Sequence, residues 1–282
     1  MNKETLNTYN NRLAKNNLDL ASVLETINSL PEAGSGELNL QDKSVEITEN
    51  GITNIVADEG YNGLNNVEVV TNVASSGADF KITNGKNFFQ YDYRIENLND
   101  LLPLFDLVYC DYMFNSSKQT SLDLRKLNTS NVISMEYMLN NCMNLKMMDV
   151  SGWNTSKVTT MKYLFQGNTQ METLNVSGWN TSNVTDMSYM FRGCVKLTTL
   201  DLSSWNTSNV TNMTYMFFDC IELTKLDIRN FDFSKVTKYT SFFNNSFDAN
   251  CEIIVKDETA KEWVLARRSD LINVKTVAEL GE

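Results

Sequence analysis

The sequence contains no histidine. This absence excludes Ser-His and Cys-His nucleophilic systems, imidazole general bases and nearly all catalytic zinc sites. The five cysteines form no Cys-x-x-Cys pair and their number is odd, so the sequence indicates neither a zinc ribbon nor a disulfide framework. We therefore expect folding in a reducing compartment, no metal site, no cofactor and no enzymatic activity.

Basic residues are the minority among the charged side chains. The chain has 24 Lys and Arg against 35 Asp and Glu, a net charge of −11 at pH 7. Nucleic acids and anionic membranes require a basic face, which this sequence lacks. It also has no apolar run of the ~20 residues that span a membrane, and its N-terminus has no apolar signal-peptide segment. We expect no nucleic-acid partner, no membrane partner and no ordinary secretion.

A 26-residue repeat occupies the C-terminal half. Trp153, Trp179 and Trp205 each begin Trp-Asn-Thr-Ser, and the same step reaches Leu127 and Phe231. Three further columns keep this step: Val132, Val158, Val184, Val210 and Val236; Met135, Met161, Met187, Met213 and Tyr239; Cys142, Asn168, Cys194, Cys220 and Ser246. Such columns are typical of stacked repeats that bury one continuous core, so we assign the tryptophans, methionines and cysteines to core packing.

Each repeat contains a Leu-x-Leu type strand, in which alternation turns the outer two side chains inward and the middle one outward. The apolar positions between Val210 and Cys220 recur at helical spacing and predict a short helix that Thr207 or Ser208 caps. The sequence therefore predicts an α/β repeat solenoid, with a parallel sheet and short helices. An end strand over Cys251–Val255, a helix over Asp257–Arg268 and a strand over 272–277 would close it.

The repeat has the pattern L-x-x-L-D-L-S-x-W-N-T-S-N-V-T-x-M-x-x-M-F-x-x-C over about residues 110–255. This pattern resembles the leucine-rich repeats of bacterial surface antigens of the BspA-like type. The resemblance implies an adhesin-like binding surface and no catalysis.

Residues 3–30 show a heptad pattern. Its seam residues are Leu6, Tyr9, Leu13, Asn16, Leu20, Val23, Ile27 and Leu30. An apolar seam with one polar residue predicts a short parallel coiled coil, with a trimer favoured. The alternative is an amphipathic helix that packs against its own domain or docks on a larger assembly.

Between residues 38 and 74, alternating apolar pairs are separated by turn signals such as Asn50-Gly51, which predicts a small antiparallel β module. This segment resembles a connector module of phage tail and tail-fibre proteins from Gram-positive hosts. The expected organisation is a helical oligomerisation or docking segment (1–31), the β module (38–74), a linker (75–79), the solenoid with its N-terminal cap (80–256) and a C-terminal cap (257–282).

A row of outward-facing polar residues is the candidate ligand-binding face. It comprises Asp123, Arg125, Asp149, Ser151, Asn175, Ser177, Asp201, Ser203, Asp227 and Arg229. Like charges on adjacent strands destabilise a sheet, so such a row favours a role in binding a sugar polymer, a cationic peptide or a cation. The alternative is that the aspartates only form hydrogen bonds with neighbouring coils.

These features together favour a phage tail, baseplate or fibre protein, assembled in the host cytoplasm and incorporated into the virion. Its N-terminus would contact other virion proteins, and its solenoid would bind a host surface protein or glycan. One alternative is a bacterial surface adhesin or protein-interaction protein of the BspA-like class. Another is a glycan-cleaving enzyme with paired carboxylates, although an open sheet provides no enclosed cleft.

Overall fold

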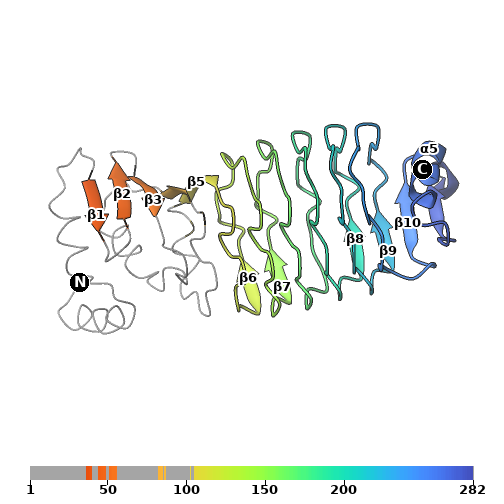
Figure 1. The fold of residues 1–282 in the computed structure, drawn as a ribbon, viewed down its shortest axis with the longest axis horizontal. Coiled ribbons are helices and arrows are strands. Elements are labelled where there is room, and N and C mark those ends of the chain that lie inside the picture. Colours follow the sequence, from red (N-terminus) through yellow and green to blue (C-terminus); the bar gives the residue numbers. More distant parts are fainter. Residues whose placement is uncertain are drawn as a thin grey trace.

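The computed structural model describes residues 36–39, 44–48, 51–55, 82–84, 86, 102 and 105–281. The predicted coiled coil over 1–31 and the predicted linker over 75–79 lie outside these residues. In the described part, strands and turns stack along one long axis, with β1 to β3 at one end and a short helix at the other (Figure 1).

Five strands form a sheet at the N-terminal end, in the order β1-β2-β3-β4-β5. They are β1 (Gly36–Asn39), β2 (Ser44–Thr48), β3 (Gly51–Ile55), β4 (Ile82–Asn84) and β5 (Phe105–Tyr109). The first three pair antiparallel, as the turn signal at Asn50-Gly51 predicts. Strands β4 and β5 join them in parallel, so the β module and the start of the repeat block share one sheet.

The repeats form a parallel β-solenoid of five coils, which we number by their first residues 121, 147, 173, 199 and 225. Four of the coils begin with a three-residue strand: β6 (Ser121–Asp123), β7 (Met147–Asp149), β8 (Thr199–Asp201) and β9 (Lys225–Asp227). We call the side formed by these strands the strand face. A second side, the bridge face, is joined by single parallel bridges from Tyr109 through Ser134, Thr160, Asp186 and Asn212 to Lys238.

The short helix predicted in each repeat is wrong. In coil 4 the amides of Met213, Tyr215 and Phe217 donate to carbonyls of coil 5, at 2.7, 2.9 and 3.1 Å. The amides of Met216 and Phe218, which follow Tyr215 and Phe217 in the sequence, donate three residues back and close turns. Every second amide thus finds its partner in the next coil, and no amide remains for the four-residue bonds of an α-helix.

A positive backbone φ in this segment also opposes a helix. It falls on the same tyrosine of successive coils, with values of 56° at Tyr137, 60° at Tyr163, 61° at Tyr189 and 56° at Tyr215. The predicted helix cap is replaced by a contact between coils: Thr207 Oγ1 donates to the carbonyl of Asp232 at 3.0 Å and accepts from its amide at 2.8 Å. The hydroxyl therefore joins coil to coil, and it caps no helix.

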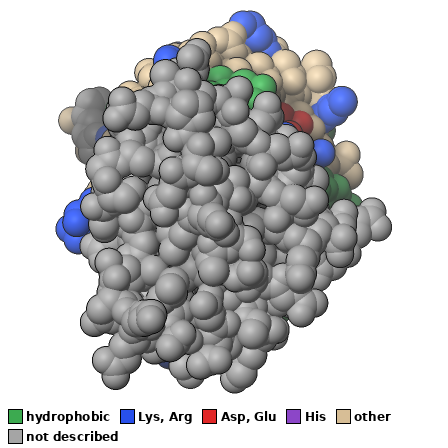
Figure 2. Space-filling model, turned by 90° about the vertical axis from the view of Figure 1, so that its left-hand side faces the viewer, with side chains coloured by type: hydrophobic (Ala, Val, Ile, Leu, Met, Phe, Trp, Pro, Cys, Tyr) green, Lys and Arg blue, Asp and Glu red, His purple; other side chains and the backbone are tan. Residues whose placement is uncertain are grey.

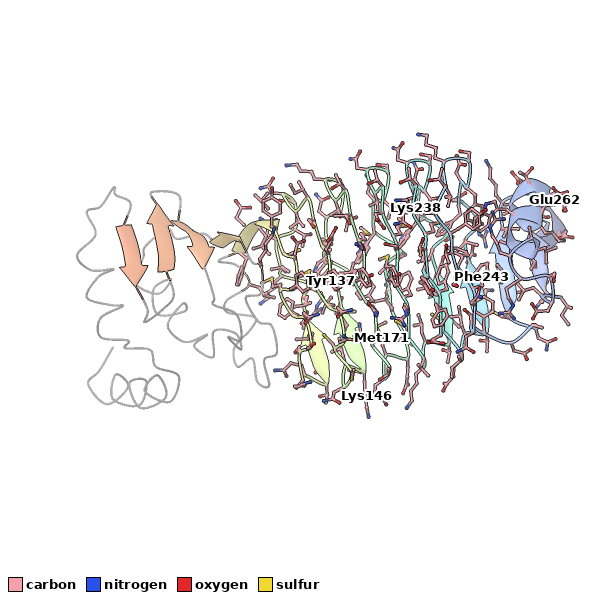
Figure 3. All side chains as sticks on the ribbon, in the orientation of Figure 1. Tyr137, Lys146, Met171, Lys238, Phe243 and Glu262 are labelled. Atoms are coloured by element: carbon pink, nitrogen blue, oxygen red, sulfur yellow. The ribbon has the colours of Figure 1, made fainter. Side chains whose placement is uncertain are left out.

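The side chains inside the coils form one continuous core, as the sequence predicts. Trp153, Trp179 and Trp205 are at most 3% exposed, and their rings stack at 5.6 and 6.1 Å between centroids. Figure 3 shows Met171 and Phe243 inside the coils, and Lys146 extending from an edge. Burial of these columns excludes the tryptophans as a ladder for stacking sugars.

The C-terminal cap follows the prediction. Strand β10 (Glu252–Val255) pairs in parallel with β9, and β11 (Val274–Thr276) pairs in parallel with β10. Helix α5 (Glu258–Leu265) lies between them in the sequence and is capped by Asp257, which accepts from the Ala260 amide. Trp263 of α5 stacks on Phe233 with 3.9 Å between ring centroids, which closes the end of the core. A 3-10 helix, η2 (Ala278–Leu280), follows β11.

Candidate ligand-binding face

The predicted polar row lies on the strand face, and its acidic residues stabilise turns. Oδ1 of Asp149 accepts from the amide and the hydroxyl of Ser151, at 3.0 and 2.7 Å. The same arrangement joins Asn175 to Ser177, and Oδ1 of Asp201 accepts from the Ser203 amide at 2.9 Å. These bonds reach two residues along the same coil, as in an Asx-turn. Most side chains of the row therefore form hydrogen bonds within their own coil, and not with neighbouring coils as the alternative prediction required.

Arginines neutralise both ends of the row. Arg125 pairs with Asp123 at 2.7 Å and reaches Asp149 of the next coil at 3.2 Å, and Arg229 pairs with Asp227 at 2.8 Å. The hydrogen bonds from Arg125 lower the pKa of Asp123 to about 2. In the described part of the chain, no lysine or arginine forms an ion pair with Asp201. Negative charge is thus least compensated in coil 4.

A groove of about 780 Å³ runs across the first four coils of this face. Six of the ten predicted residues line it, namely Asp123, Asp149, Ser151, Asn175, Ser177 and Asp201. Arg125, Ser203, Asp227 and Arg229 are not among the lining residues. The sequence reasoning missed the remaining side chains of the groove, which include Met147, Met148, Thr173 and Thr199. Met147 is 68% exposed. Met147, Thr173 and Thr199 stand 26 residues apart, and this repetition could have identified them as residues of one face.

The parallel ladder of the strand face is interrupted beneath this groove. Strands β6 and β7 form one sheet, β8 to β11 form another, and coil 3 has no strand between them (Figure 1). The amides of Leu124 and Leu202 donate to the next coil at 2.9 and 2.8 Å. Among the described residues, the equivalent amides of Val150 and Val176 have no backbone partner. Coil 3 therefore lacks the strand pairing of its neighbours on this face, where only the Thr198 amide donates to the Glu172 carbonyl, at 3.4 Å, among the described residues, whereas its bridge-face pairing is intact.

Two further observations locate the gap between coils 2 and 3. The indole Nε1 atoms of Trp153 and Trp205 donate to Leu124 and Val176 carbonyls, at 3.0 and 3.2 Å. The Nε1 of Trp179, whose equivalent acceptor is the Val150 carbonyl, is buried without a hydrogen-bond partner. A side chain built on Gly152 would lie 2.1 Å from the carbonyl oxygen of Arg125 in coil 1, whereas one built on Gly178 meets nothing within 4 Å. At this position coil 2 is tightly apposed to coil 1, whereas coil 3 has open space beside coil 2.

The structure also shows a stack of half-buried tyrosines that the sequence reasoning missed. Tyr112, Tyr137, Tyr163, Tyr189 and Tyr215 stack ring on ring, with centroids 4.2 to 5.0 Å apart. Burial raises the pKa of Tyr137, and its hydrogen bond with Tyr163 raises it further. Because each ring face covers its neighbour, the stack exposes edges and leaves its interior rings no free face for a ligand. We assign it to coil stacking.

The cysteine column is chemically inert in this fold. The thiols of Cys142, Cys194 and Cys220 are buried and donate to carbonyls of Phe114, Phe165 and Phe191, at 3.2, 3.2 and 3.1 Å. Burial raises the pKa of Cys142 and of Cys194 to about 12. Such thiols are neutral at physiological pH and are poor nucleophiles and metal ligands.

Neither a metal-binding cluster of side chains nor a helix suited to cross a membrane occurs among the described residues. No group of three or more His, Cys, Asp or Glu side chains in them is arranged to hold a metal ion. None of their helices combines the length and apolar character needed to cross a bilayer. Figure 2, which looks along the long axis from the N-terminal end, shows scattered Lys and Arg side chains at the rim of the described surface.

Comparison with known proteins agrees with this architecture. No curated protein and no solved structure gives a significant match. The family described as "Mycoplasma protein of unknown function, DUF285" matches residues 108–201 and 170–264. Together these matches span 108–264, which is more than half of the 282 residues and covers the five coils. The two overlapping matches are those of a repeat array, and they fit the BspA-like pattern of the sequence. The chain belongs to the DUF285 family.

Proposed function

We propose that this chain is a non-enzymatic binding protein that presents the strand face of its solenoid to a macromolecule. The observation that carries this proposal is the groove across the first four coils, which is lined by six residues of the predicted face. A groove that crosses several coils suits an extended polymer better than a compact small molecule. Its acidic side chains are engaged in capping turns, which favours binding over acid-base catalysis.

Exposed threonines on two faces provide a matched test. Thr173 and Thr199 line the groove, whereas Thr185 and Thr211 are exposed on the bridge face. We expect the variant Thr173→Arg with Thr199→Arg to lose at least tenfold in affinity for cell-wall polymers, surface glycans or peptides immobilised as a panel. The variant Thr185→Arg with Thr211→Arg should bind as the parent chain does. Equal behaviour of the two variants, or no binding to any member of the panel, would refute the proposal.

Multivalency would strengthen such a surface. The heptad segment between Leu6 and Leu30 would hold several solenoids together, and avidity raises apparent affinity by ~10²–10⁴. Light scattering of the full chain should give a multimer, with a trimer favoured. Leu13→Asp combined with Leu20→Asp should give a monomer with weaker binding to a surface and unchanged binding to a single soluble ligand. A monomeric parent chain would rule out the avidity mechanism.

Display on a phage virion is the second candidate. Its support is the N-terminal segment, in which β1, β2 and β3 pair antiparallel where the sequence resembles a tail connector module. The competing location is a bacterial surface, which the BspA-like repeat pattern favours at least as well. Antibody labelling distinguishes them: label on purified virions supports the tail role, and label on uninfected cells supports the surface role.

A further inference from the structure

The hydrogen-bond ladder of the strand face is interrupted at the junction of coils 2 and 3. Three independent observations coincide at the junction of coils 2 and 3: the unpaired Val150 amide, the buried and unpartnered Nε1 of Trp179, and the open space at Gly178. Trp179 is 3% exposed, and its equivalents in coils 2 and 4 point at the carbonyl that corresponds to Val150 O. Val150 lines the groove, whereas Trp179 and Gly178 are not among its lining residues.

Unpaired main-chain groups favour a ligand that has main-chain groups of its own. A buried amide without a partner costs free energy, and the main chain of a peptide supplies carbonyl acceptors. The groove also presents the thioether side chains of Met147 and Met148, which adapt to varied aliphatic contacts. Among the described residues, no aromatic side chain lines the groove, so these residues offer no ring on which a sugar would stack. These contacts favour a peptide over a glycan.

The negative charge of the groove favours a peptide with basic side chains. Asp149 and Asp201 lie two coils apart, which corresponds to roughly 10 Å at the usual spacing of strands. The neutral Asn175 separates them; Oδ2 of Asp149 also lies 3.2 Å from Nε of Arg125, whereas Asp201 forms no ion pair within the described residues. Two carboxylates at this separation complement two basic side chains of one extended chain. The net charge of −11 reinforces the attraction.

We propose that the groove over coils 2 to 4 binds an extended peptide segment that carries lysine or arginine side chains. The peptide lies across the coils, its basic side chains contact Asp149 and Asp201, and a main-chain carbonyl of the peptide accepts a hydrogen bond from the Val150 amide where the ladder is open. This assignment rests on the proposed binding function and specifies the ligand of the same face.

The test uses the full chain and three synthetic peptides of one design, in which lysine, glutamine or glutamate alternates with leucine and serine. We expect only the lysine peptide to bind, with an affinity that falls as salt is raised. Asp149→Asn combined with Asp201→Asn should weaken binding at least tenfold. These substitutions reproduce the turn cap that Asn175 already forms, so folding is preserved. The matched control is Asp232→Asn, which changes an aspartate of a different turn column to the asparagine found at Asn206.

A second readout locates the peptide. Bound lysine peptide should slow amide hydrogen exchange at Val150 and Val176, and leave bridge-face amides such as that of Thr185 unchanged. Equal binding of the glutamate peptide, full binding by the double variant, or unchanged exchange at coils 2 and 3 would overturn the proposal. If glycans bind the strand face while the lysine peptide does not, the ligand class is wrong and the binding function stands. If the Thr173→Arg, Thr199→Arg chain binds every ligand normally, the binding function itself fails.

Discussion

Two glycines at equivalent positions of neighbouring coils give the sharpest test of the gap in the ladder. A Cβ atom on Gly152 would lie 2.1 Å from the Arg125 carbonyl oxygen, whereas a Cβ atom on Gly178 has no neighbour within 4 Å. For Gly152→Ala the two coils must separate by roughly 1 Å, and overpacking of this kind costs about 1–3 kcal/mol. Gly178→Ala meets no contact, and it restricts the unfolded chain, which stabilises by about 0.4–1 kcal/mol. Because restriction of the unfolded chain applies to both variants, their free energies of unfolding should differ by the overpacking cost alone, about 1–3 kcal/mol.

Urea unfolding followed by tryptophan fluorescence measures this difference. With a denaturant slope of about 2 kcal/mol per molar, the midpoints should be separated by roughly 0.5–1.5 M, with Gly178→Ala at or above the parent chain. The parent chain and both variants contain the same tryptophans, so their fluorescence changes on unfolding can be compared directly. Equal destabilisation of the two variants would show that coils 2 and 3 are as closely apposed as coils 1 and 2. The interrupted ladder, and the ligand class inferred from it, would then be wrong.

Buried and ion-paired side chains give three further predictions. Trp205→Phe should destabilise the chain about 2 kcal/mol more than Trp179→Phe, because the first removes a hydrogen bond and the second removes an unsatisfied N–H; equal midpoints in urea would contradict this. Thermal stability should fall as the pH drops from about 4.5 towards 2. In the folded state Arg125 lowers the pKa of Asp123 and Lys275 lowers the pKa of Glu252, so protonation of these carboxylates favours the unfolded chain. A melting temperature that stays constant over this pH range would refute the prediction. The native thiols, Cys194 among them, should not react with a thiol reagent until the chain unfolds, and burst labelling of the folded protein would disprove their burial.

The sequence predicted the solenoid but assigned its second segment incorrectly. The columns of tryptophan, valine and methionine required stacked units with one shared core, and those residues are buried as expected. The run from Val210 to Cys220 has helical spacing of its apolar residues, yet it forms turns. Periodicity within one repeat shows which residues face inward, and it does not show whether their amides bond within the coil or to the next one.

The sequence predicted which residues form the candidate face, but it did not predict the gap between coils on that face. Alternation in each Leu-x-Leu segment placed Asp149 and Asp201 outward, and both lie on the strand face. The Asx-turn role of these side chains follows from local sequence, because an aspartate two residues before a serine amide is a common turn. The gap at coil 3 had no signal of this kind, since coil 3 carries the same pattern as its neighbours.

The sequence by itself determined the repeat length, the number of coils, the composition of the core and the residues of the outward row. These properties depend on local alternation and on the self-similarity of the repeats. Only the tertiary structure decided that the coils contain turns in place of helices, that the tyrosines stack, and that the ladder is open beneath the groove. Each of these depends on how closely one coil approaches the next, which is set by the packing of the whole stack and by no single repeat.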